Sequence, residues 1–350
     1  MIKEHTSLRF IFIFFIFLGH VLFPGHGGAG AAFFFVLSGF GLTLGYKNKI
    51  LLPEFSYKIF IKKRFIKLYP LHWILLLCSI PLVYRQLASI KTIPILLLNI
   101  GLLQTWVPIK SVYYSFNSVS WFLADTVFLT LVFPSLYKAI TNMSKIGRVF
   151  FATGLLIIYF ILFFLLPLNQ DMRHALFYIH PVARLMDFII GIYLANVFVS
   201  WRENLKVVLF VSNNNWLLRI LTFFSVLFLF WSSYLKEKPF PTAYYWPMII
   251  VVILATALSS MNNNEGGLLR KKWIVSLGEI SFEFFLLHQL VIKYCSLLFR
   301  YVVHYDNIYV LAAICFLVSI IGSYLISIYI NKPIIKWLTN KIQPSTTVRS

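Results

Sequence analysis

The chain has 350 residues, of which 60% are apolar and 12% are charged. A soluble domain carries about 25% charged and about 45–50% apolar residues, so this composition excludes an ordinary soluble globular protein. The formal net charge is +20, but Lys and Arg gather in short segments beside apolar runs. That placement is typical of the cytoplasmic loops of a membrane protein, so nucleic acid is not expected as a partner.

Apolar runs long enough to cross ~30 Å of hydrocarbon as a helix recur along the chain. We expect one all-α domain, a polytopic transmembrane helical bundle over 1–335, with a short cytoplasmic tail over 336–350. About ten spans are predicted, at 8–24, 30–46, 70–88, 119–138, 148–167, 182–199, 216–234, 243–260, 276–299 and 308–330. The first is expected to be a permanent helix rather than a cleaved signal peptide. The stretch 93–106 is apolar but short, which favours a re-entrant or interfacial helix.

The basic residues predict the orientation of these spans. With the N-terminus inside, 21 of the 31 Lys and Arg fall in cytoplasmic segments, seven fall in outer loops and three lie within spans. Basic residues accumulate on the cytoplasmic side of membrane proteins. The bias therefore predicts that both termini lie in the cytoplasm.

The first helix carries two ionisable residues, Arg9 and His20, which are costly inside a bilayer and therefore candidates for function. Eleven positions return a helix to within about 20° of the same face and advance it by about 16 Å. This spacing predicts one polar stripe, with Arg9 at the cytoplasmic entrance and His20 near the outer side. The alternative is that Arg9 reaches lipid phosphate and that His20 hydrogen-bonds to a neighbouring helix.

Three later spans carry further polar groups. Asp125 enters from the outer side and is predicted to orient His20, although a structural ion pair is the alternative. Arg184 and Asp187 are three positions apart and are predicted to pair along one helix face. Glu283 and His288 lie about 140° apart on the ninth span, so they are expected to contact different neighbours.

A basic stretch, 62–67, precedes Tyr69 and Pro70 on the predicted cytoplasmic face. Its charges could hold the phosphates of a soluble donor. Attraction to anionic lipid is an equally simple interpretation.

Together these pieces resemble the acyltransferase-3 family, multispan bacterial enzymes that often O-acetylate surface polysaccharides. The resemblance runs over about 5–330 and consists of pieces in the family's order. They are the Arg9 to His20 spacing, FFVLSGF at 34–40, RFIKLYP at 64–70, SWFLAD at 120–125, RLMDFIIG at 184–191 and SFEFFLLH at 281–288. Three positions depart from the family pattern: Lys67 replaces an Arg, and Asp125 and Asp187 replace Glu. No periplasmic domain of the kind that longer relatives append is expected after the tenth span.

The resemblance implies transfer of an acyl group, most often acetyl, from cytoplasmic acyl-CoA to a saccharide hydroxyl, in the inner membrane of a bacterium. Acyl-CoA and the saccharide acceptor are then the expected partners within the lipid bilayer, with no tightly bound cofactor and no metal. It implies donor binding by Arg9, Arg64 and Lys67. It also implies catalysis by His20, either as general base on the acceptor hydroxyl or as a transient carrier of the acyl group, with Asp125 to orient it. Ser38 and His288 would lie along the acyl path or at the oxyanion. Tyr69, Trp121, Arg184, Asp187 and Glu283 would support the site.

Two other classes of protein place charges inside spans. A secondary transporter or flippase does so, and it would move a solute without consuming acyl-CoA. A non-catalytic membrane sensor or assembly partner would tolerate the loss of Arg9 and His20.

Overall fold

The structure is a computed structural model that describes residues 2–23, 28–84, 89–90, 92–233, 242–262, 267–304 and 307–342. Across these ranges the chain forms helices and no strand. Ten of the described helices are long and apolar enough to cross a membrane. The predicted helical bundle of ten spans is therefore confirmed.

The long helices are α1 (Lys3–Val21), α2 (Gly28–Ile50), α3 (Tyr57–Ser79), α7 (Ser120–Asn142), α8 (Lys145–Leu165), α10 (Pro181–Arg202), α11 (Leu205–Ser233), α12 (Trp246–Ser259), α14 (Ser281–Leu298) and α15 (Ile308–Ile326). Shorter helices are α5 (Thr92–Gly101), α6 (Lys110–Tyr113), α9 (Gln170–His174), α13 (Lys272–Glu279) and α16 (Lys332–Ile342). Short 3₁₀ and π turns extend several of them, including Ile80–Val83, Gln104–Trp106, Ala175–Ile179 and Ser327–Asn331.

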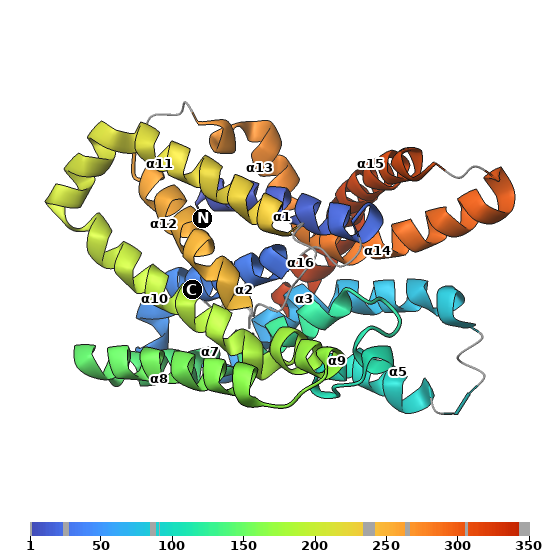
Figure 1. Ribbon diagram of the computed structural model, residues 1–350, viewed down its shortest axis with the longest axis horizontal. Coiled ribbons are helices and arrows are strands. Elements are labelled where there is room, and N and C mark those ends of the chain that lie inside the picture. The colour runs from blue at the N-terminus through green and yellow to red at the C-terminus, as the bar shows by residue number, and fades with distance from the viewer. Residues whose placement is uncertain are drawn as a thin grey trace, which may run out of the picture.

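Helix α1 lies inside the bundle and α8 lies at its edge (Figure 1). In the apolar window of α1 61% of the residues are buried, whereas in that of α8 only 11% are. The exposed apolar side chains of α8 have the character of a lipid-facing surface, because a bilayer accepts apolar groups that water would not. Most of α1 is therefore enclosed by protein, while His20, near its C-terminal end, is exposed.

Helices α2 and α10 cross at two glycines. A Cβ atom on Gly39 would overlap the carbonyl of Phe188, and one on Gly191 would overlap the carbonyl of Val36. Small residues at such crossings let two helix backbones approach closely within a membrane. The contact fixes α2, and with it Ser38, against the interior of the bundle.

Helix α3 begins at Tyr57, well before the predicted start at residue 70, so the basic stretch is helical rather than a loop. The Ser56 hydroxyl caps this helix by accepting a hydrogen bond from the Ile59 amide at 3.3 Å. Pro70 lies inside the helix without ending it. The span of 27 residues is about 40 Å long, so its basic end extends beyond ~30 Å of hydrocarbon.

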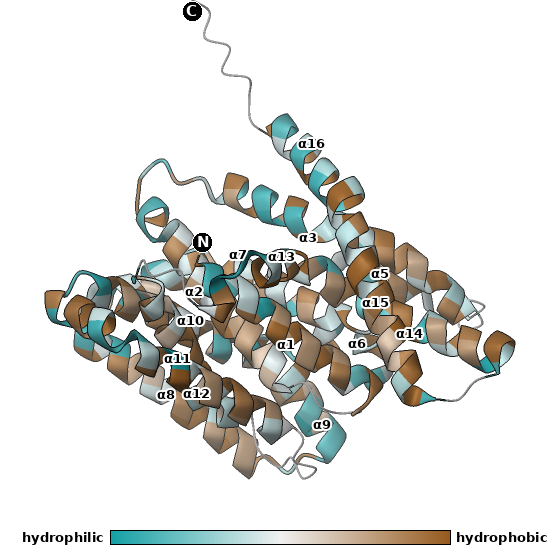
Figure 2. Cartoon of the chain, turned by 90° about the horizontal axis from the view of Figure 1, so that it is seen from above, coloured by the Kyte–Doolittle hydropathy of each residue, from teal (hydrophilic) through white to brown (hydrophobic). Residues whose placement is uncertain are grey.

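The predicted span 276–299 is wrong at its start, because a break at Ile280 separates α13 from α14. The tail predicted for 336–350 begins as helix, since α16 continues to Ile342, and residues 343–350 lie outside the described ranges. Figure 2 shows α16, which carries both hydrophilic and hydrophobic residues, extending from the apolar bundle. The stretch 93–106 forms α5 and a 3₁₀ turn, so the prediction of a short helix is confirmed, and its re-entrant or interfacial position stays a prediction.

Candidate functional site

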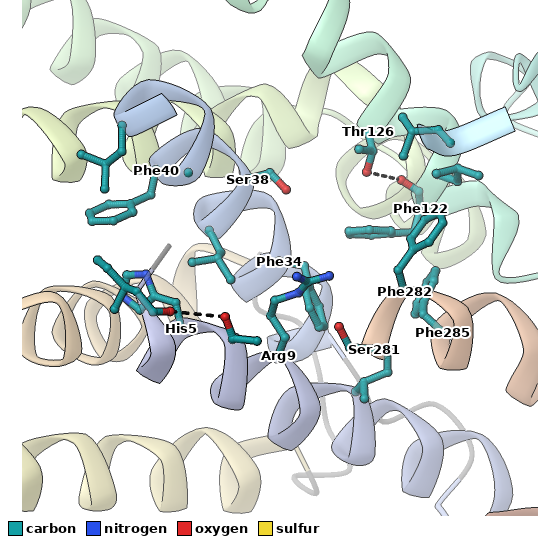
Figure 3. Close-up of a pocket in the computed structure, with 18 residues that line it drawn as sticks. His5, Arg9, Phe34, Ser38, Phe40, Phe122, Thr126, Ser281, Phe282 and Phe285 are labelled. Carbon is teal, nitrogen blue, oxygen red and sulfur yellow. Dashed lines mark hydrogen bonds between the residues drawn. The ribbon is translucent and has the colours of Figure 1, made fainter. Parts of the chain in front are cut away.

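A cavity of about 300 Å³ lies beside the first half of α1, between α1, α2, α7 and α14 (Figure 3). Most of its wall is apolar, and Phe34, Phe122 and Phe285 contribute aromatic rings. Its polar lining residues are His5, Thr6, Arg9, Ser38, Thr126 and Ser281. An apolar cavity with a few convergent polar groups is the usual form of a small-molecule site.

Arg9 projects into this cavity, and Ser38 and Ser281 reach it from other walls (Figure 3). The negative charge that acts on Arg9 belongs to Glu283. The Asn331 amide donates a hydrogen bond to Oε1 of Glu283 at 2.7 Å, and the buried Oε2 has no hydrogen-bond partner. Arg9 therefore offers a cationic side chain at the predicted cytoplasmic end of the cavity.

His20 lies at the other end of α1, paired with His288 of α14. The Nδ1 atom of His20 is 2.8 Å from Nε2 of His288, and Nδ1 of His288 is 3.1 Å from the carbonyl oxygen of Phe284. His288 is fully buried, whereas His20 is exposed. Glu283 and His288 contact different neighbours, as the angle between them predicted.

Phe285 lies between the cavity and the His20–His288 pair. Its side chain lines the cavity, and its ring centroid is 6.0 Å from that of His288. The cavity therefore ends about one aromatic ring from the histidine pair. Arg9 and His20 both lie in α1, in which eleven residues rise by about 16 Å.

Asp125 does not hydrogen-bond to His20, so the prediction that it orients this ring is corrected. Asp125 is fully buried, and among the described side chains Thr105, not His20, supplies the hydrogen-bonding group that acts on it. The charged groups that act on it are Arg184 and Asp187 of α10. The sequence placed Asp125 at the right end of its helix but could not show which face of α7 meets α1.

Arg184 and Asp187 form the predicted pair along α10, with 2.7 Å between Nη1 and Oδ2 and no exposure of either side chain. Arg184 also donates from Nε to the Tyr178 carbonyl at 2.7 Å, and the Trp246 indole donates to Oδ1 of Asp187 at 2.5 Å. His174 lies in α9, outside the membrane spans. Burial, and after it the positive charges of Arg184 and Lys110, lower the pKa of its imidazole to about 4. This charged cluster joins α10 to α12 and has the geometry of a structural network.

The predicted donor-binding and supporting residues of α3 lie beside the cavity rather than in its wall. The Arg64 guanidinium lies 4.9 Å from the ring centroid of Tyr46, and its buried Nε lacks a partner. Lys67 is exposed. The Tyr69 hydroxyl donates to the Gly101 carbonyl at 3.1 Å, which ties α5 to α3. Trp121 packs on Phe35 and Tyr178, with ring centroids 6.3 and 5.2 Å away.

Two residues of this region went unrecognised in the sequence. His5 precedes Arg9 by one helical turn on the same face, which was a usable signal. It lines the cavity, and its Nε2 lies 3.1 Å from the Ile253 carbonyl. Asn331 carried no such signal, because it reaches Glu283 from a helix 48 positions further along the chain.

Similarity to known proteins identifies the family of this chain. Residues 6–331 match the family Acyl_transf_3, described as an acyltransferase domain. A stretch of 123 residues is 30% identical to the acyltransferase MdmB of Streptomyces mycarofaciens, covering 33% of this chain and 30% of that protein. This match therefore spans less than a third of the relative's length. No solved structure matches. Because the family match covers nearly the whole chain, this protein belongs to the Acyl_transf_3 family of membrane acyltransferases.

Proposed function

We propose that this membrane acyltransferase moves an acyl group, in the simplest case acetyl, from cytoplasmic acyl-CoA to a saccharide hydroxyl at the outer side of a bacterial inner membrane. One observation carries the proposal. A single helix, α1, bears a cationic cavity at one end and an exposed histidine at the other, and Phe285 lies between them. A donor bound at one end can thus present its acyl group at the other.

The donor phosphates bind at the cytoplasmic end. Arg9 supplies charge-assisted hydrogen bonds from within the cavity, and Arg64 and Lys67 add positive charge from the basic half of α3. Lys67 is a point charge and does not offer the bidentate geometry of Arg. The pantetheine arm lies along the apolar wall, past Ser38, toward Phe285.

His20 acts as the general base. Its unprotonated nitrogen takes the proton from the acceptor hydroxyl, and the oxygen attacks the thioester carbonyl. The C–S bond then breaks, and the leaving thiolate of CoA recovers the proton from His20. Atoms and charge balance with acyl-CoA as the only co-substrate. Ser38 lines the cavity beside Arg9, so it contacts the donor arm rather than the oxyanion.

The test compares surface glycans from cells that lack this gene and carry either the wild-type protein or His20→Ala. Wild type is expected to restore base-labile acetyl groups, detected by the mass of each acetyl on the released glycan. His20→Ala removes the base and is expected to lower transfer by about 10²–10⁴-fold at equal abundance in the membrane. Unchanged acetylation by His20→Ala would contradict the assignment.

His304→Ala is the matched control, because His304 is an exposed histidine outside the spans. It is expected to acetylate like wild type. Arg9→Gln is expected to raise the KM for acetyl-CoA, because it removes the charge from the cavity. Purified protein that moves a solute and consumes no acyl-CoA would instead identify a transporter.

A further inference from the structure

Three groups lie in line at the outer end of the site: His20, His288 and the Phe284 carbonyl. Nδ1 of His20 is 2.8 Å from Nε2 of His288, and Nδ1 of His288 is 3.1 Å from the Phe284 carbonyl oxygen. The imidazole planes differ by 10°, and their centroids are 5.1 Å apart. This separation is about the nitrogen–nitrogen distance plus two ring radii. The rings therefore lie edge to edge in nearly one plane, which is the geometry of an N–H···N hydrogen bond rather than of face-to-face stacking.

The chemistry of these groups assigns the protons. A carbonyl oxygen only accepts, so Nδ1 of His288 must carry the hydrogen that it donates to Phe284. In a neutral imidazole the other nitrogen is then an acceptor, so Nε2 of His288 receives a hydrogen bond. The donor is Nδ1–H of His20, which leaves Nε2 of His20 unprotonated.

Burial separates the roles of the two rings. His288 is fully buried and uses both of its nitrogens within the protein. Because His288 has no N–H left to donate, it does not stabilise the oxyanion of the tetrahedral intermediate. His20 is exposed, so its unprotonated Nε2 is the nitrogen available to a substrate hydroxyl.

We propose that His288 is a positioning residue that holds His20 in the Nδ1–H tautomer and thereby directs the basic Nε2 toward the acceptor hydroxyl. This inference rests on the proposed acyl transfer and adds to it the orienting group that Asp125 does not supply. Free imidazole side chains in water favour the Nε2–H tautomer, in which the exposed nitrogen could not accept a proton. The buried ring and its carbonyl reverse that preference.

No carboxylate hydrogen-bonds to either ring within the part of the chain that the structure describes. The surroundings of His288 are the aromatic rings of Phe17, Phe284 and Phe285. In a Ser-His-Asp triad a buried carboxylate fixes the tautomer of the base and stabilises its cation. Here the neutral imidazole of His288, held by the Phe284 carbonyl, fixes the tautomer of His20. When His20 becomes charged, the lone pair on Nε2 of His288 accepts a stronger hydrogen bond from it.

The first test reads the tautomer directly and needs no substrate. Nitrogen-15 NMR of histidine-labelled protein in nanodiscs is expected to show the signals of one imidazole with a protonated Nδ1 and an unprotonated Nε2. These signals are expected to be absent in His20→Gln, which assigns them to His20. In His288→Ala this ring is expected to revert to the Nε2–H form. A wild-type His20 already in the Nε2–H form, or a tautomer unchanged by His288→Ala, would overturn the proposal.

The second test is kinetic and uses acetyl-CoA as donor with membranes of the deletion strain as acceptor. His288→Ala is expected to lower kcat by about 10²-fold or more, because the base loses its orientation, and to leave the KM for acetyl-CoA unchanged. His288→Gln places an amide oxygen near the former Nε2 and is expected to recover kcat to within about 10-fold of wild type. Equal losses in the Ala and Gln variants would show that an imidazole itself is required, against a positioning role.

His72→Ala is the matched control, because His72 is equally buried and its Nε2 also lies within hydrogen-bond distance of a carbonyl, that of Asn99 at 2.8 Å. Its kcat per folded molecule is expected to equal that of wild type. If the wild type transfers acyl groups, His20→Ala does not and His288→Ala does so normally, the positioning role fails while the proposed function stands. If the wild type transfers none, the proposed function fails and the NMR result still decides the tautomer.

Discussion

The ion pairs of this protein differ in burial, and the difference decides what each contributes. Arg184 and Asp187 are both fully buried and 2.7 Å apart. Lys110 and Asp171 form a pair of 3.9 Å with side chains 70% and 83% exposed. A buried charge that loses its partner cannot recover the hydration it gave up on folding, whereas an exposed one can.

Arg184→Gln is therefore expected to lower the free energy of unfolding by about 3–5 kcal/mol, since it leaves Asp187 buried and unpaired. The measurement is an unfolding titration with SDS in mixed micelles. Lys110→Gln is the control and is expected to change the same quantity by less than about 1 kcal/mol. Similar effects of the two substitutions would contradict a structural role for the buried pair.

At the scale of the elements, α2 and α10 cross in close backbone contact. Gly39 and Gly191 face each other there, and a methyl group on either would overlap backbone atoms of the opposite helix. Gly45 lies further along α2, where an added Cβ would meet nothing within 4 Å. A glycine-to-alanine substitution in α2 can therefore be compared at a packed position, Gly39, and at an open one, Gly45.

Gly39→Ala is expected to destabilise the protein by about 1–3 kcal/mol or more, because backbone atoms cannot move aside without separating the helices. Gly45→Ala is expected to be neutral or to stabilise by up to about 1 kcal/mol, the difference in helix propensity. The apparent melting temperature of both variants in detergent checks this. Equal melting temperatures would show that the α2–α10 crossing tolerates a wider separation.

The whole molecule combines ten spans with two helical segments that outreach the bilayer. The helix from Ile308 to Ile342 has 35 residues and is about 52 Å long, so α16 lies beyond ~30 Å of hydrocarbon. It packs against α3, whose basic end also extends beyond the hydrocarbon. The described residues hold an even number of spans, so we expect the start of α1 and the end of α16 on the same side of the membrane.

Reporter fusions test that side. Alkaline phosphatase fused after Leu168, between α8 and α9, is expected to be active because the predicted orientation puts that connection outside the cytoplasm. Fusion after Met143, between α7 and α8, is expected to be inactive, and green fluorescent protein after Ile342 is expected to fluoresce. The opposite pattern would reverse the orientation and place the Arg9 end of the cavity away from cytoplasmic acyl-CoA.

Local features of the sequence predicted much of this architecture. Apolar runs predicted ten helices, because a bilayer demands helices of a given length whatever they pack against. Helical spacing predicted that Arg9 and His20 share a stripe and that Arg184 pairs with Asp187. The ends of the helices were predicted less well. The charged residues at the start of α3 led to the prediction of a loop there, although the helix continues through them.

What the sequence by itself determined is thus the class of protein, the number of spans and the contacts within single helices, since these depend on neighbours along the chain. Only the tertiary structure decided that His288 rather than Asp125 meets His20, because that contact joins residues 268 positions apart. It also decided that Asn331 holds Glu283 near Arg9. Periodicity defines the faces of one helix, but the rotation of each helix against the next depends on packing between distant segments of the chain.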